Sequence, residues 1–200
     1  VGLMITFLTG YYVSTNPNML YNIFATKLYW VIFIAELITV VVLSARIMKM
    51  SKNGAIFGFL LYSFITGLTF SSIFVLFKMS SIMFVFLITA VLFLVFALIG
   101  YFTKTDLTKL GSILFMGLLG IILASLLNLI FKSESFDLVL IILGIIIFIG
   151  YIAYDINKVK RLEGMVDEDK LAIIGALDLY LDFLNLFIRL IQIFGKSNDN

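Results

Sequence analysis

The sequence LAIIGALDLYLDFLNLFIRLIQIF, residues 171–194, is apolar along most of its length and long enough to cross a bilayer as a helix. Four polar residues interrupt it at spacings of four, three and four: Asp178, Asp182, Asn185 and Arg189. On an α-helix these spacings place all four side chains on one face. A carboxylate at bilayer depth costs about 2.5–3.5 kcal/mol on insertion scales. Two carboxylates on one face therefore indicate a polar cavity or partners inside the protein, and we interpret this face as a candidate path for ions or protons.

The rest of the chain has the composition of an integral membrane protein. Of its 200 residues, 62% are hydrophobic and only 13% are charged, which leaves too little polar surface to cover a soluble globule. Residues 1–13 are apolar but too few for a complete span, and because the chain opens on Val1 we interpret them as the end of a further span. The sequence predicts an all-α polytopic protein with seven transmembrane helices in one domain, residues 1–200. The six full spans that we predict are 28–47, 54–77, 81–102, 111–131, 136–157 and 171–194.

Cysteine and histidine are both absent from the sequence. This excludes disulfides, a thiol nucleophile and the usual ligands of zinc, haem and iron–sulfur centres. The oxygen ligands that remain suit protons or a hard cation such as Ca²⁺. We therefore expect no cofactor, calcium and protons as the ions handled, the lipid bilayer as the surroundings and no nucleic-acid partner, and the sequence indicates no particular protein partner.

The basic residues between the predicted spans are unevenly distributed. Alternate connections carry nine lysines and arginines on one side and four on the other. The positive-inside rule places the richer side in the cytoplasm, which with seven spans puts the N-terminus in the cytoplasm and the C-terminus outside. We expect a plasma or inner membrane, or the endoplasmic reticulum if the source is eukaryotic. The nine are Arg46, Lys49, Lys52, Lys104, Lys109, Lys158, Lys160, Arg161 and Lys170, and the four are Lys27, Lys78, Lys132 and Lys196.

Three more charged residues lie in or at the end of predicted spans. Glu36 is in the middle of the first full span, where either a structural hydrogen bond or a place on an ion path would explain it. Arg46 is close to the cytoplasmic end of the same span, where an interface anchor and a functional role are both open. Asp155 ends the apolar run of the span at 136–157.

Asp155 and Asp182 are expected to lie at the same height. Helical periodicity continues past Asp155, so we place the hairpin apex near the acidic residues 167–169. Asp155 is thirteen residues before Glu168 and Asp182 is fourteen after it. Two facing carboxyls with little water do not both ionise easily, so we expect them to share a proton and titrate together, or to bind a cation such as Ca²⁺. The alternative is that Asp155 is an interfacial carboxylate satisfied by Lys158 or by water.

Together, four segments resemble the Bax inhibitor-1 family, and its bacterial members in particular. The resemblance covers nearly the whole chain, and the Tyr-Asp of the third segment with the LYLDFxNLF pattern of the fourth is its most specific part. The segments are FLLYSFITGLTFSSIF (59–74), GYFTKTDLTKLGSILFMGLLGIILASLLN (100–128), AYDINKVKRL (153–162) and ALDLYLDFLNLF (176–187).

The resemblance implies seven helices with the C-terminal one central and wrapped by the other six, and a calcium leak that responds to pH. It also implies a di-aspartyl sensor, which matches Asp155 and Asp182 here, and an arginine latch on that sensor, which most nearly matches Arg46. The sequence departs from the family pattern at Asp178, a third carboxylate where relatives often have a neutral residue.

Two other classes of function compete with a channel. Intramembrane aspartyl proteases also pair a Tyr-Asp with an aspartate in the next span. They need GxGD at the second aspartate and a later Pro-Ala-Leu, whereas here the second aspartate is in LYLD (179–182) and the sole proline is Pro17. We therefore expect no enzymatic activity. A non-conducting membrane adaptor or stress-regulatory protein stays open, because a buried ionic cluster can be purely structural.

Overall fold

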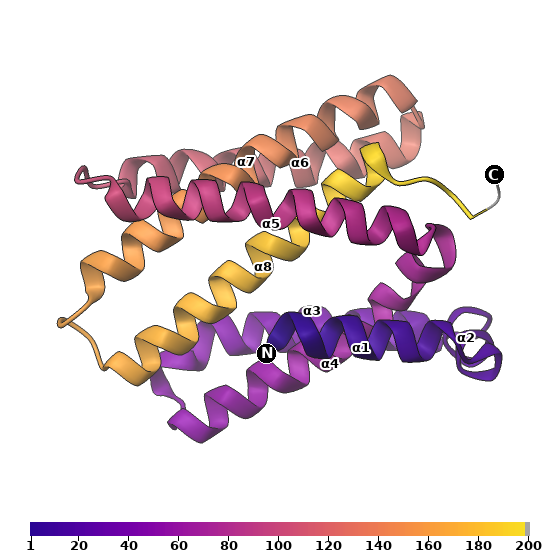
Figure 1. Ribbon diagram of the computed structural model, residues 1–200, viewed down its shortest axis with the longest axis horizontal. Helices are drawn as coiled ribbons and strands as arrows, with labels where there is room; N and C mark the ends of the chain where they lie inside the picture. Colours follow the sequence, from indigo (N-terminus) through magenta and orange to yellow (C-terminus); the bar gives the residue numbers. More distant parts are fainter. Residues whose placement is uncertain (199–200) are drawn as a thin grey trace. The chain divides into compact units, whose positions relative to one another are not determined.

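The computed structural model describes residues 1–198, and these are almost entirely helical (Figure 1). The expected all-α class is therefore confirmed. Within this range the one β-type contact is an isolated bridge between Phe77 and Ser197. The helices are α1 (Gly2–Ser14), α2 (Pro17–Phe24), α3 (Leu28–Arg46), the 3₁₀ turn η1 (Ile47–Lys49), α4 (Lys52–Leu76), α5 (Met79–Phe102), α6 (Thr108–Phe131), α7 (Glu134–Leu162) and α8 (Glu168–Phe194).

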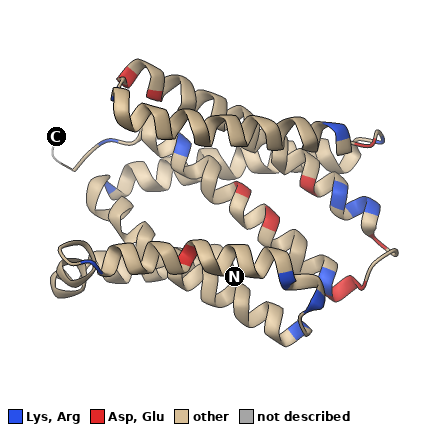
Figure 2. Cartoon of the chain, turned by 180° about the vertical axis from the view of Figure 1, so that it is seen from behind, with Lys and Arg blue, Asp and Glu red and all other residues tan. Residues whose placement is uncertain are grey.

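Six helices of the described chain are long and apolar enough to cross a membrane: α3 with η1, α4, α5, α6, α7 and α8. Each corresponds to one of the six full spans expected from the sequence. Figure 2 shows most charged residues near helix ends, as expected for helices whose middle parts lie in lipid. At 13 residues α1 is shorter than a complete span, so the seventh crossing stays a prediction.

Helices α7 and α8 both extend beyond the apolar runs that define their spans. α7 continues to Leu162 through basic residues, which are good helix formers and favourable near a helix C-terminus. α8 begins at Glu168, where Asp167 caps it by accepting a hydrogen bond from the Lys170 backbone N–H at 3.0 Å. The acidic residues 167–169 thus start α8, and the turn comes just before them, with Gly164 at a φ of 75°. The apex expected at these residues is therefore slightly displaced.

The chain forms two compact units, and the prediction of a single domain over residues 1–200 stays a prediction. The first unit contains residues 1–82, 167–177 and the C-terminal residues from Lys196. Within it α4 packs against both α1 and α3. Gly67 of α4 allows the close approach of α1, since a Cβ there would lie 2.6 Å from the Thr9 Cβ. Thr6 Oγ1 donates a hydrogen bond to the backbone oxygen of Ser63 at 2.9 Å in the same contact.

Two lysines hold the start of α8 in place within the first unit. Lys52 Nζ lies 2.7 Å from Asp169 Oδ1, and Lys170 Nζ donates to the backbone oxygen of Met48 at 2.9 Å. These contacts connect the first turn of α8 to the segment between α3 and α4. The start of α8 is thereby fixed against α3 and α4 of the same unit.

The second unit contains residues 83–166 and 178–195. α6 and α7 pack together along their length, and α5 approaches α7 so closely that a Cβ at Gly100 would overlap the backbone of Ala153. The second half of α8 packs on α5 through an aromatic cluster, in which Phe183 lies 5.2 Å from Phe86 and 5.7 Å from Phe93 between ring centroids. This packing positions the polar face of α8 within the second unit.

Candidate functional site

The buried carboxyl groups of Asp155 in α7 and Asp182 in α8 meet in the second unit. Their side chains are hydrogen-bonded to each other, and the two residues are only 6% and 5% exposed. Two carboxyls can form this bond only when one of them carries a proton. The buried Asp182 Oδ2 atom has no hydrogen-bond partner among residues 1–198. The pair is therefore arranged to hold a proton, or another positive charge, between its oxygens.

Lys158 and Asp178 extend this pair into a network of four ionisable groups. It lies one turn after Asp155 on α7, with its Nζ 3.8 Å from Asp155 Oδ1. The same Nζ donates a hydrogen bond to Asp178 Oδ2 on α8 at 2.9 Å. Asp155 therefore contacts both of the partners considered for it from the sequence, Asp182 and Lys158. The carboxylate closest to the Lys158 ammonium, however, is that of Asp178.

Three of the four residues of the polar face expected on α8 lie opposite residues of α7. Partner numbers fall along α7 as they rise along α8, which is the order of an antiparallel helix pair. The facing positions are Asp178 with Lys158, Asp182 with Asp155, and Arg189 with Gly144.

The remaining polar residues of this face have different surroundings. Asn185 Nδ2 donates to the Leu181 backbone oxygen of its own helix at 2.8 Å. Arg189 packs over Gly144, where a Cβ would lie 3.0 Å from its Nε. The nearby opposite charge is Asp137, in the first turn of α7. These two residues are thus separate from the Asp155–Asp182 contact.

Glu36 and Arg46 belong to α3 in the first unit, whereas the two aspartates belong to the second. Glu36 Oε2 accepts a hydrogen bond from Thr69 Oγ1 of α4 at 2.9 Å, so this carboxylate has a structural partner. Arg46 is the last residue of α3, and its side chain is exposed. Its role as a latch stays a prediction.

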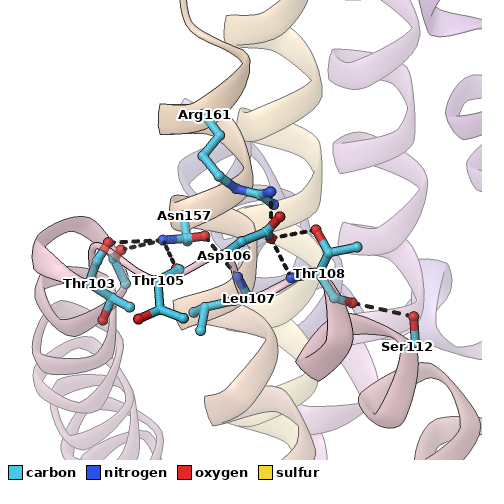
Figure 3. Close-up of polar contacts among 9 residues, drawn as sticks. Thr103, Thr105, Asp106, Leu107, Thr108, Ser112, Asn157 and Arg161 are labelled. Atoms are coloured by element: carbon cyan, nitrogen blue, oxygen red, sulfur yellow. Dashed lines mark hydrogen bonds and ion pairs between the residues drawn. The ribbon is translucent and has the colours of Figure 1, made fainter.

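Asn157, between the site residues Asp155 and Lys158, is a positioning residue that the sequence interpretation missed. It is 2% exposed and binds the loop between α5 and α6 (Figure 3). Its Oδ1 accepts from the Leu107 backbone N–H at 3.3 Å, and its Nδ2 donates to the Thr103 backbone oxygen at 3.1 Å. The available signal was an amide side chain at the end of an apolar run, where a buried polar group needs partners.

One turn further along α7, Arg161 binds the same loop. Its Nη1 lies 2.5 Å from Asp106 Oδ1, which also accepts hydrogen bonds from the Thr108 backbone N–H at 2.8 Å and hydroxyl at 2.6 Å (Figure 3). The hydrogen bonds from Thr108, with a smaller contribution from Arg161, lower the pKa of Asp106 below its usual 3.8. This contact fixes the start of α6 against the end of α7 that carries the charged network.

Calcium coordination by Asp155 and Asp182 stays a prediction. Among the residues that the structure describes, no group of three or more aspartates, glutamates, cysteines or histidines has an arrangement that could hold a metal ion. The Lys158 ammonium instead lies against two of the three carboxylates in this region. Chemically, the arrangement can share a proton, and a cation that enters it meets Lys158.

Comparison with known proteins gives a family match over nearly the whole chain. The family model described as "Inhibitor of apoptosis-promoting Bax1" matches residues 1–199. The chain is 42% identical to the inner membrane protein YbhL of Escherichia coli (strain K12), over 98% of this chain and 87% of that protein. It is 39% identical to an uncharacterised protein of Borreliella burgdorferi, over 100% of this chain and 89% of the relative. The chain is therefore a membrane protein that belongs to the Bax inhibitor-1 family.

Proposed function

We propose that the protein is a pH-sensitive, calcium-permeable channel or leak pathway controlled by Asp155 and Asp182. The observation that supports this most strongly is the hydrogen-bonded carboxyl pair, which is buried between two candidate membrane helices. Membrane helices rarely bury two carboxyls in contact unless the site has a function. Membership of the Bax inhibitor-1 family is consistent with this proposal.

The shared proton provides the switch. While one carboxyl is protonated, the pair is held by a hydrogen bond and carries a single negative charge. Loss of the proton leaves two like charges in contact, and either a shift of α7 relative to α8 or the arrival of a cation relieves their repulsion. A bias of only ~1.4 kcal/mol between two conformers changes their ratio tenfold. Acidification should therefore favour the hydrogen-bonded arrangement.

The proposed architecture has seven spans, with α1 as part of the first and α8 at the centre. In support, half of the residues in the most apolar stretch of α8 are buried, a larger share than in the other five candidate spans of the described chain. The N-terminus would be cytoplasmic and the C-terminus outside, as the distribution of basic residues indicates. The inner-membrane relative from Escherichia coli supports the same kind of membrane for this chain.

The other candidate residues have secondary roles in this proposal. Arg46 would act as a latch on the carboxyl pair. Glu36, Asp178, Asn185 and Arg189 would offer polar groups to the ion along its path. Calcium would meet the carboxylates of Asp155 and Asp182 directly, because its preferred ligands are oxygens.

Calcium entry into proteoliposomes of purified protein, followed with an enclosed fluorescent indicator, tests whether the protein conducts at all. We expect entry above that of protein-free liposomes, and a loss of it on acidification. Equal rates in the two kinds of liposome at every pH would support a non-conducting adaptor instead. If the protein cleaved a peptide that corresponds to a membrane span, and if Asp182→Asn abolished this cleavage, the protein would instead be a protease.

A further inference from the structure

Lys158 is the cation that lies among three carboxyl groups. Its Nζ is 2.9 Å from Asp178 Oδ2 and 3.8 Å from Asp155 Oδ1, and Asp155 in turn is hydrogen-bonded to Asp182. The other basic residues near this end of α7 have different partners: Lys160 Nζ donates to the Tyr101 backbone oxygen at 2.7 Å, and Arg161 pairs with Asp106. Among the described residues, the network therefore contains three carboxyls and one ammonium group.

The position of Lys158 allows it to be displaced. Its side chain is 32% exposed and that of Asp178 is 25% exposed, whereas the Asp155 side chain is 8% exposed. An entering ion thus meets the lysine and Asp178 before the buried pair. A lysine ammonium is a compact charge on a flexible stem, and it donates to either carboxylate without a fixed geometry. The short contact to Asp178 and the longer one to Asp155 fit an ammonium that two carboxylates share.

We propose that the Lys158 ammonium is a built-in cation that competes with the transported cation for the carboxylates of Asp155 and Asp178, and so sets the cation affinity of the path. This inference rests on the proposed function and identifies the residue that determines its cation affinity. A bound Ca²⁺ needs carboxylate oxygens that Lys158 now occupies. The calcium ion must therefore displace the Lys158 ammonium. The free energy of the ammonium–carboxylate contacts that are lost lowers the affinity of the site for calcium.

Removing the charge of Lys158 should therefore strengthen calcium binding. The test is calorimetric titration of purified, detergent-solubilised protein with CaCl₂, which requires no flux. Lys158→Gln should lower the apparent Kd about tenfold, equivalent to ~1.4 kcal/mol. Lys158→Arg, which keeps the charge, should stay close to the parent.

A matched control separates this effect from a general loss of positive charge. Lys160→Gln removes the same charge from the same helix end, but this side chain contacts Tyr101, over whose ring its Nζ lies at 4.9 Å. It should leave the Kd unchanged. A Kd for Lys158→Gln equal to that of the parent, or an equal tightening by Lys160→Gln, would overturn the inference.

Asp178→Asn provides a second test if Lys158→Gln does not fold. Without the Asp178 carboxylate, the ammonium has Asp155 as its remaining acidic contact, so calcium binding should weaken. Unchanged binding would count against the competition. Failure of the proposed function would look different, because calcium entry into proteoliposomes would then equal entry into protein-free liposomes, whatever Kd the Lys158 variants show.

Discussion

The residues of the candidate site differ in how far their contacts could be predicted from the sequence. Asp155 and Asp182 could be predicted as a pair, because a carboxylate in or beside an apolar run is costly and needs a partner. The geometry of Lys158 could not be predicted, since a lysine at a helix end is usually an interface anchor. The structure shows instead that its Nζ reaches across to Asp178 on the next helix.

At the same scale, we expect Asn157→Ala to destabilise the protein by about 1–3 kcal/mol. The substitution leaves the backbone N–H of Leu107 and the backbone oxygen of Thr103 without their side-chain partner. Thermal unfolding of detergent-solubilised protein measures the effect. Asn128→Ala is the control: Asn128 also bonds to a loop backbone, at Ser133, but it does so where water can replace it. An equal loss of stability for both variants would contradict the role given to Asn157.

At the scale of the helix, the lengths of apolar runs predicted which segments form spans, because a bilayer requires about 20 apolar residues. They did not predict where the helices end. α7 and α8 continue into charged sequence, since the Asp167 cap and the basic residues of the last turn stabilise helix ends in water. Packing faces were only partly predictable: a small residue such as Gly67 marks a close helix contact, but lipid-facing and protein-facing positions are otherwise both apolar.

The contact between α1 and α4 makes a second stability prediction. Gly67→Ala would place a Cβ 2.6 Å from the Thr9 Cβ and 2.9 Å from the Thr6 backbone oxygen, so the helices must separate. We expect a loss of about 1–3 kcal/mol, measured by thermal unfolding. Gly120→Ala on α6 is the matched control, because its Cβ would meet no atom within 4 Å and alanine favours a helix. A Gly67→Ala protein as stable as the Gly120→Ala protein would contradict the close packing of α1 on α4.

For the whole molecule, the distribution of basic residues predicts that the connection between α7 and α8 is cytoplasmic. The 200-residue sequence has no cysteine, and Met165 in this connection is 79% exposed, so Met165→Cys introduces a single accessible thiol into it. A membrane-impermeant thiol reagent should label it from the cytoplasmic face of inverted vesicles. Labelling only from the outer face of intact cells would show that the predicted orientation is wrong.

The pH profile of calcium flux through proteoliposomes tests the central claim most directly. Asp155→Asn and Asp182→Asn each remove one member of the hydrogen-bonded pair, so each should flatten the pH dependence of the flux. Lys196→Ala changes a residue near the C-terminus, outside the charged network, and should keep the profile of the parent. If both asparagine variants instead showed the parent's pH profile, control of the ion path by Asp155 and Asp182 would be wrong.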